Sequence, residues 1–154
     1  MQRNETLGTA TPLSSIMLLG SISPYSDPSG STVPDVDVYQ VSAAPGTQVS
    51  LYVDANNDFV QPPLPNSFLP VLEIVDSTGT RYQTCTPPGY SGGGLTFNNA
   101  CINGLNGTFY QSTYYQFQVP GSGTAPVTFY VRVSDARGDA RPDFVYTLSV
   151  YGVN

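Results

Sequence analysis

The chain has no His, no Lys and no Trp, and these absences exclude several kinds of chemistry. His is the commonest general base at neutral pH and the commonest transition-metal ligand. Without it, neither a Ser-His-Asp nor a Cys-His catalytic arrangement can be built from this chain alone. The absence of Trp weakens the case for a sugar-binding site, because large aromatic faces are what stack on sugar rings.

The charge balance and the lack of long apolar runs argue against two kinds of partner. Eleven acidic residues stand against five Arg, so the formal net charge of −6 repels phosphate backbones and anionic lipid headgroups. No stretch is long enough to cross a bilayer. The apolar run at 16–19 is too short for the core of a signal peptide. If the protein is exported, as its composition suggests, we expect Met1 to mark a trimmed or cloned start. The sequence predicts neither nucleic-acid binding nor membrane insertion.

Residues that favour helices are scarce as well. The chain holds two Met and two Glu, whereas Gly, Pro, Ser, Thr, Val and Tyr dominate. That mixture is typical of many short strands joined by tight turns. A chain of 154 residues can bury one core without a metal or several disulfides. We predict one all-β domain over 1–154, a sandwich in which 1–12 form a polar N-terminal arm.

Alternation of apolar and polar residues predicts eight or nine strands and no helix. The clearest pair, 36–43 and 47–53, flanks Pro45-Gly46 and is predicted to form a hairpin. The stretch between Pro24 and Pro34 is rich in Ser, Gly and Pro, and is predicted to be a loop. The remaining strands are expected at 13–23, 69–76, 81–84, 108–119, 126–134 and 144–150, with a short edge strand at 95–97.

The two cysteines, Cys85 and Cys101, bracket fifteen residues rich in Gly, Asn and Pro. A disulfide between them would close the loop 85–101 and stabilise the fold by about 3 kcal/mol in the chain-entropy model. Such bonds persist in oxidising compartments, so we expect a secreted or cell-surface location. Two free buried thiols in a cytosolic protein are the alternative, which the polar flanks of both cysteines disfavour.

Asp35 and Asp37 lie two residues apart where a strand begins, so both side chains leave the same side of the backbone. They repel each other unless a cation or a hydrogen-bond donor lies between them. Two explanations stay open: a solvated strand end, in which Asp37 pairs with an Arg or a backbone donor, and a calcium site.

Seven short segments spread along the chain carry a family resemblance. They are Asn4-Glu5-Thr6 with Ala10-Thr11-Pro12-Leu13, Gly20-Ser21-Ile22-Ser23, Asp35-Val36-Asp37-Val38-Tyr39, Ala44-Pro45-Gly46, Pro70-Val71-Leu72-Glu73-Ile74-Val75-Asp76 with Gly79, Phe129-Tyr130-Val131-Arg132-Val133-Ser134-Asp135, and Tyr146-Thr147-Leu148-Ser149-Val150. In this order they resemble the bacterial pre-peptidase C-terminal domain. That module is found beside secreted peptidases and is related to the collagen-binding domains of clostridial collagenases.

The resemblance implies a jelly-roll-like antiparallel sandwich with no active site, which serves substrate attachment, export or maturation of an attached protein. In calcium-binding members an N-terminal acidic segment packs against the aspartates before the second strand. Carried over to this chain, and with Asp27 added because calcium takes about six to eight oxygen ligands, the implied metal ligands are Asn4, Glu5, Asp27, Asp35 and Asp37.

The chain departs from the family pattern at two places near this implied site. Gln2 and Arg3 stand where the calcium-binding members carry an acidic residue, and an eleven-residue loop containing Asp27 intrudes before Asp35. Calcium is therefore a candidate cofactor that the sequence alone does not establish, and no other cofactor is expected.

The eleven Tyr offer aromatic faces that stack on sugars or prolines. Those in or beside the long loop are the candidate platform for an extracellular polysaccharide or a collagen-like protein: Tyr90, Tyr110, Tyr114 and Tyr115. Tyr is also a common strand residue with a half-buried ring. For most of the eleven we expect that structural role.

We expect a non-catalytic accessory or binding module of a secreted or cell-surface bacterial or archaeal protein, which attaches to an extracellular polymer or assists export or maturation of an attached enzyme. The alternative is a structural subunit of a surface layer or extracellular filament, whose N-terminal arm or edge strands pair with neighbouring subunits. A hydrolase with Asp35 and Asp37 as paired acids ranks last, since two carboxylates at one strand end do not flank a substrate.

Overall fold

The structure is a computed structural model that describes most, but not all, of the chain. The described residues are 4–13, 17–26, 29–30, 32–33, 35–55, 68, 70–85, 112–135, 138, 140–141 and 144–153. At 25–26, 32–33, 81–85 and 112–115 the description covers the backbone alone.

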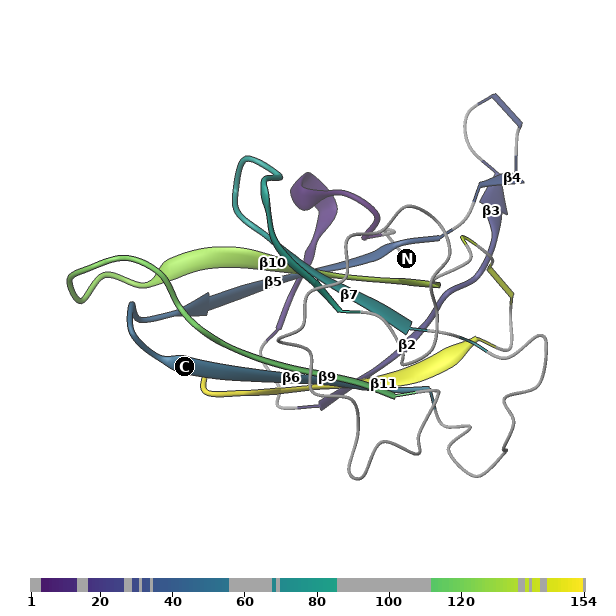
Figure 1. The fold of residues 1–154 in the computed structure, drawn as a ribbon. Helices are drawn as coiled ribbons and strands as arrows, with labels where there is room; N and C mark the ends of the chain where they lie inside the picture. The colour runs from purple at the N-terminus through teal and green to yellow at the C-terminus, as the bar shows by residue number, and fades with distance from the viewer. Residues whose placement is uncertain are drawn as a thin grey trace.

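Two sheets pack face to face and form a sandwich (Figure 1). The five-stranded sheet has the order β1-β5-β10-β7-β8, and the four-stranded sheet has the order β2-β11-β6-β9. Apart from the parallel pair β1 and β5, neighbouring strands are antiparallel. The nine strands are β1 (Thr11–Pro12), β2 (Met17–Ser21), β5 (Asp37–Ala43), β6 (Gln48–Asp54), β7 (Pro70–Val75), β8 (Arg81–Cys85), β9 (Ser112–Gln118), β10 (Val127–Asp135) and β11 (Val145–Tyr151). The predicted jelly-roll-like antiparallel sandwich is confirmed.

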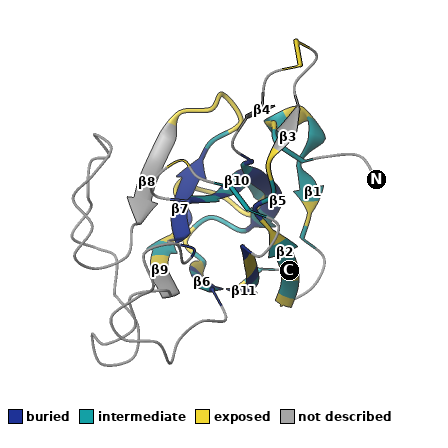
Figure 2. Ribbon diagram, turned by 90° about the vertical axis from the view of Figure 1, so that its right-hand side faces the viewer, coloured by how far each residue is buried: buried dark blue, intermediate teal, exposed yellow. Residues whose placement is uncertain are grey.

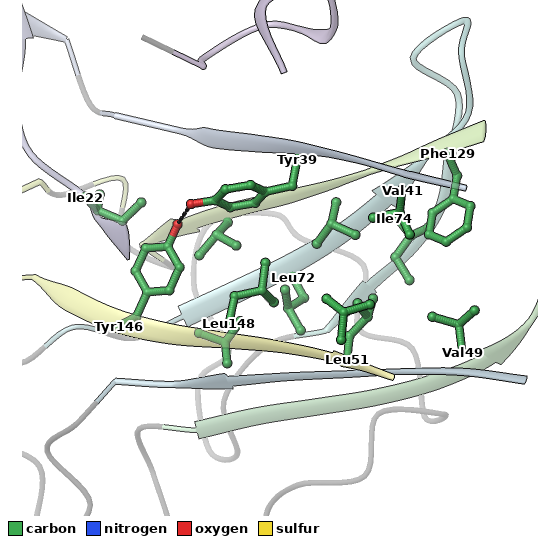
Figure 3. Close-up of a cluster of buried hydrophobic side chains, with 14 of the residues drawn as sticks. Ile22, Tyr39, Val41, Val49, Leu51, Leu72, Ile74, Phe129, Tyr146 and Leu148 are labelled. Atoms are coloured by element: carbon green, nitrogen blue, oxygen red, sulfur yellow. Dashed lines mark hydrogen bonds between the residues drawn. The ribbon is translucent and has the colours of Figure 1, made fainter. Parts of the chain in front are cut away.

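The core lies between the sheets and is built from alternate residues of the facing strands (Figure 3). On β6, for example, Val49, Leu51 and Val53 are fully buried, whereas Ser50 and Tyr52 between them are half-buried on the opposite face. Each fully buried aliphatic or aromatic side chain contributes about 1.5–3 kcal/mol to folding. The largest of them are Tyr146, Phe68, Phe129 and Phe144.

Strands β5 and β6 lie in different sheets, so the hairpin predicted across Pro45-Gly46 is wrong. The turn carries the chain from one layer to the other, and Gly46 adopts a φ of +81°, which favours glycine. Two backbone hydrogen bonds of 2.9 Å, from the Gly46 N–H to the Val119 carbonyl and from the Val119 N–H to the Thr47 carbonyl, hold the turn against the end of β9. Each of the two strands presents one apolar face to the same core. The sequence alternates between apolar and polar residues in the same way whether two strands form a hairpin or lie in opposite sheets, so alternation could not distinguish the two.

The connection between β7 and β8 is a true hairpin, as predicted. Two small elements were not predicted. Within the loop expected at 24–34, β3 (Tyr25–Ser26) pairs with β4 (Thr32–Val33) and projects from the sandwich (Figure 1). A single 3-10 turn, η1 (Leu7–Thr9), lies in the N-terminal arm. The edge strand expected at 95–97 lies outside the described residues.

Strand β7 is buried on both faces, unlike its neighbour β10, along which buried and half-buried residues alternate (Figure 2). Its Glu73 lies directly across from Arg132 of β10, and the carboxylate oxygen is 3.1 Å from the guanidinium nitrogen. Glu73 is 6 % exposed, and a carboxylate this deeply buried needs such a partner. The alternation along 69–76 therefore predicts the strand correctly, but it does not predict that the outer face of the strand is buried as well.

Within the described ranges, no helix is long and apolar enough to span a membrane.

Candidate functional site

A chain of hydrogen bonds joins the two sheets at one end of the core (Figure 3). The hydroxyls of Tyr39 on β5 and Tyr146 on β11 lie 2.6 Å apart. Tyr146 also donates a hydrogen bond of 2.6 Å to Oδ2 of Asp37. Because a tyrosine hydroxyl has one hydrogen, Tyr39 must donate to Tyr146. All three residues are buried. The hydrogen bonds run from Tyr39 on the five-stranded sheet to Tyr146 on the four-stranded sheet, and from there back to the Asp37 carboxylate on the five-stranded sheet.

Asn4 connects the N-terminal arm to this hydrogen-bond network. The Asn4 side chain is hydrogen-bonded to that of Tyr39. Its Nδ2 also donates to the Val38 carbonyl at 3.2 Å, and the backbone carbonyl of Asn4 accepts from the Val38 N–H at 2.7 Å. Further along the arm, β1 runs parallel to β5 and the Leu13 N–H donates to the Gln40 carbonyl. The arm is therefore part of the sandwich from Asn4 onward.

Burial raises the pKa of both tyrosines. For Tyr39, burial is the largest cause, followed by the negative charge of Asp37, and the pKa lies well above its ordinary value of 10.0. The pKa of Tyr146 is raised by burial and by its contacts with Tyr39 and Asp37. Both hydroxyls therefore keep their protons at neutral and mildly alkaline pH and serve as hydrogen-bond donors.

Asp35 and Asp37 are 5 % and 8 % exposed, so they are not a solvated strand end. A hydrogen-bond donor is found for each: the Ser23 N–H donates to Oδ2 of Asp35 at 3.0 Å, and the Tyr146 hydroxyl donates to Asp37. One donor comes from the segment after β2, 12 residues before Asp35, and the other from β11, 109 residues after Asp37. Hydrogen bonding to a carboxylate stabilises its charged form, which offsets part of the cost of burying two acids close together.

The structure brings part of the predicted calcium set to one place. Asn4 reaches Tyr39, which bonds through Tyr146 to Asp37, and Asp35 precedes the same strand. Glu5 is half-buried beside Asn4 in the arm. Within the part of the chain that is described, no group of three or more His, Cys, Asp or Glu is arranged to hold a metal ion. Asp27 lies outside the described residues, and the calcium site stays a prediction.

The predicted aromatic platform falls mostly outside what is described. Tyr90 and Tyr110 are not described, and for Tyr114 and Tyr115 on β9 the backbone alone is. In the backbone register of β9, Tyr115 is paired with Leu51 and Tyr114 with Tyr52. The platform stays a prediction.

The outer surface of the four-stranded sheet carries residues that sequence reasoning did not single out. Neighbouring positions on β6, β9 and β11 form an uncharged patch of amide, hydroxyl and aromatic groups, which we name the tyrosine–glutamine face. Its members are Gln48, Ser50, Tyr52, Gln116, Gln118 and Tyr151. Gln116 donates a hydrogen bond of 3.1 Å to the Ser50 hydroxyl, and Tyr151, in register with Ser50, is 54 % exposed. Their alternation with buried residues along β6 and β11 was the signal available in the sequence.

Cys85 ends β8, and Cys101 lies outside the described residues. The disulfide between them, and the loop 85–101 that it would close, stay predictions.

No protein-family model matches the chain, and no curated protein matches its sequence. The fold and the hydrogen-bond network define an antiparallel β-sandwich in which three buried acids, Asp35, Asp37 and Glu73, hold one part of the fold to another. The resemblance to the pre-peptidase C-terminal domain stays a prediction.

The raised pKa values of Tyr39 and Tyr146 predict a loss of stability at alkaline pH. Their contribution is fully present below the unfolded-chain value near 10.0 and is lost as the pH rises from there toward the folded-state values. Each tyrosine then lowers the free energy of unfolding by about 1.4 kcal/mol per pH unit, because only the unfolded chain releases the proton. Urea unfolding between about pH 8 and about pH 11 measures this slope.

The matched variants are Tyr146→Phe and Tyr151→Phe. We expect Tyr146→Phe to reduce the alkaline slope by about half, since one of the two buried hydroxyls is gone. Tyr151→Phe changes a ring that is 54 % exposed and should leave the slope as it is. A wild-type stability that stays level across this range would contradict the assignment.

Proposed function

We propose that the chain is a non-catalytic binding module of a secreted or cell-surface protein, which attaches to an uncharged extracellular polysaccharide. The resemblance to the pre-peptidase C-terminal domain supports the class of module, and the observed sandwich is the fold that this resemblance implies. Assistance to the export or maturation of an attached enzyme belongs to the same class of role.

The tyrosine–glutamine face is the observation that carries the proposal. Its glutamine amides and hydroxyls both donate and accept hydrogen bonds, as the hydroxyls of a sugar chain require. Tyr151 adds an exposed ring that can stack on a sugar face. The six residues carry no charge, so the face favours an uncharged polymer although the chain as a whole has a net charge of −6.

The contacts of three buried carboxylates support a non-catalytic role. Asp37 accepts from Tyr146 of the other sheet, and Asp35 accepts from the backbone after β2. Glu73 pairs with Arg132 on the neighbouring strand. A general acid or base must reach a substrate proton, whereas these three groups hold one part of the fold to another.

A second candidate function is a structural subunit that assembles with neighbouring subunits. The observation that favours it is the edge strand β2, where Met17 and Leu19 are 65 % and 79 % exposed. The described N-terminal arm pairs with β5 of its own chain, so the edge strand is the part of the molecule that carries this candidate.

Binding of polysaccharide should be visible by co-sedimentation with insoluble cellulose or chitin. Collagen fibrils are tested separately as the alternative ligand. Tyr151→Ala should weaken binding about fivefold, because a stacked aromatic contact contributes about 1 kcal/mol. Tyr130→Ala makes the same change on the outer surface of the five-stranded sheet and should leave binding unchanged. Binding to none of these polymers, or equal weakening by both variants, would contradict the proposal.

Calcium binding by Asn4, Glu5, Asp35 and Asp37 is proposed as part of the same module. A ligand at about 100 times its Kd stabilises the folded state by about 2.7 kcal/mol. For a chain of this length that corresponds to a rise in Tm of roughly 5–10 °C over the value with chelator.

Asp35→Asn should abolish the calcium-dependent rise in Tm. Asp76→Asn is the matched control, because Asp76 is a carboxylate in the β7–β8 turn that is bonded to Thr78 and Thr80 of its own turn. Its calcium response should equal that of the wild type. An identical Tm with calcium and with chelator would contradict the proposed metal site.

A further inference from the structure

Among the described residues, the large apolar and aromatic side chains that are exposed all lie on the outer surface of the four-stranded sheet. They are Met17, Leu19, Val145 and Tyr151, and Leu19 is the most exposed at 79 %. The residues that alternate with them, such as Leu18 on β2 and Tyr146 on β11, pack in or against the core. Exposed apolar side chains that gather on one face indicate a binding surface, whereas single ones scattered over a protein do not.

Leu19 and Val145 form an apolar patch at one end of this surface. In the antiparallel pair of β2 and β11, Leu19 lies opposite Thr147, and Ser21 lies opposite Val145. Leu19 and Val145 are therefore diagonal neighbours on one face, about 7–8 Å apart, which is within the reach of long side chains. We name Leu19, Val145 and Thr147 the leucine–valine patch.

The leucine–valine patch continues into the tyrosine–glutamine face along β11. Val145 and Tyr151 lie six residues apart on the outer side of this strand, which corresponds to about 20 Å at about 3.4 Å per residue. Tyr151 lies opposite Ser50 of β6, whose hydroxyl accepts a hydrogen bond from Gln116. A polymer lying along β11 therefore meets apolar side chains at one end and a ring with amides and hydroxyls at the other.

We propose that this surface binds a polysaccharide whose sugars carry N-acetyl groups, as in chitin. The inference rests on the proposed function and names the class of polysaccharide. Each acetamido group of such a polymer combines a methyl group with an amide. The methyl groups pack on Leu19 and Val145, and the amides hydrogen-bond with the glutamine side chains, which both donate and accept. A sugar ring stacks on Tyr151.

The chemistry of the surface disfavours other occupants. Cellulose has hydroxyls and ring faces but neither methyl groups nor amides, so it would leave the leucine–valine patch exposed to water. Asp54 of β6 lies on the other side of Thr147 from Leu19, and the net charge of the chain is −6. These negative charges disfavour an anionic polymer, an anionic lipid surface and a second copy of the chain.

Co-sedimentation of the whole chain with chitin and with cellulose, which lacks the acetamido groups, tests the inference. The wild type should bind chitin about tenfold more tightly than cellulose, because burial of methyl groups adds to the affinity. Leu19→Ser should weaken binding to chitin about fivefold and leave binding to cellulose unchanged. Leu7→Ser makes the same change in η1, beside Gly79 of the β7–β8 turn, and should bind chitin like the wild type.

The outcomes separate this inference from the proposed function. Equal binding to chitin and cellulose, equal weakening on both polymers in Leu19→Ser, or equal weakening by Leu19→Ser and Leu7→Ser would overturn the inference alone. Binding to neither polymer would contradict the proposed function and the inference with it. A mass above 16.4 kDa at sedimentation equilibrium that falls to 16.4 kDa in Leu19→Ser would assign the leucine–valine patch to a second copy and would also overturn the inference.

Discussion

The hydrogen bonds from Tyr39 through Tyr146 to Asp37 fix the two sheets against each other at one end of the core. Hydrophobic burial favours any arrangement that removes apolar surface from water, so by itself it leaves the relative position of two apolar sheet faces loosely defined. A buried hydroxyl without a partner costs about 1–3 kcal/mol. The network is therefore satisfied only when Tyr146 of β11 reaches the ends of Tyr39 and Asp37 on β5. The position of Tyr146 also constrains β2, because a Cβ on Gly20 would overlap the Tyr146 ring.

This end of the sandwich is committed to holding the fold together. The N-terminal arm joins it through Asn4, and the segment after β2 joins it through the bond from the Ser23 N–H to Asp35. The surface that we propose for polysaccharide binding lies elsewhere, on the outer side of the four-stranded sheet. The tyrosine–glutamine face offers neutral hydrogen bonding and an exposed ring, whereas β2 carries the exposed apolar side chains of Met17 and Leu19.

Alternation along the sequence predicts the class of fold and the positions of most strands, because it reports which face of each strand is apolar. The strand expected at 126–134, for instance, is found as Val127–Asp135. Alternation does not report which strand pairs with which. Strands β5 and β6 were therefore predicted to form a hairpin, although their apolar faces meet across the core instead.

The candidate site, like the fold, could be predicted from the sequence only in part. Asp35 and Asp37 stand out in the sequence as two acids that need a cation or a donor, and donors are what the structure shows. The identity of the donors depends on long-range packing, since Tyr146 lies 109 residues from Asp37. The residues of the outer surface could be assigned only once the neighbours of β6 and β11 were known, because composition directs attention to the tyrosines near the long loop instead.

A double-mutant cycle on Tyr39→Phe and Tyr146→Phe, followed by urea unfolding at neutral pH, tests the central claim most directly. Each single variant should lose about 1–3 kcal/mol of unfolding free energy, because a buried partner is left without its hydrogen bond. The double variant should lose less than the sum of the two by at least about 0.5 kcal/mol, the lower limit for residues in one hydrogen-bond network. Losses that add to within about 0.3 kcal/mol would mean that the two hydroxyls act independently, and would contradict the account.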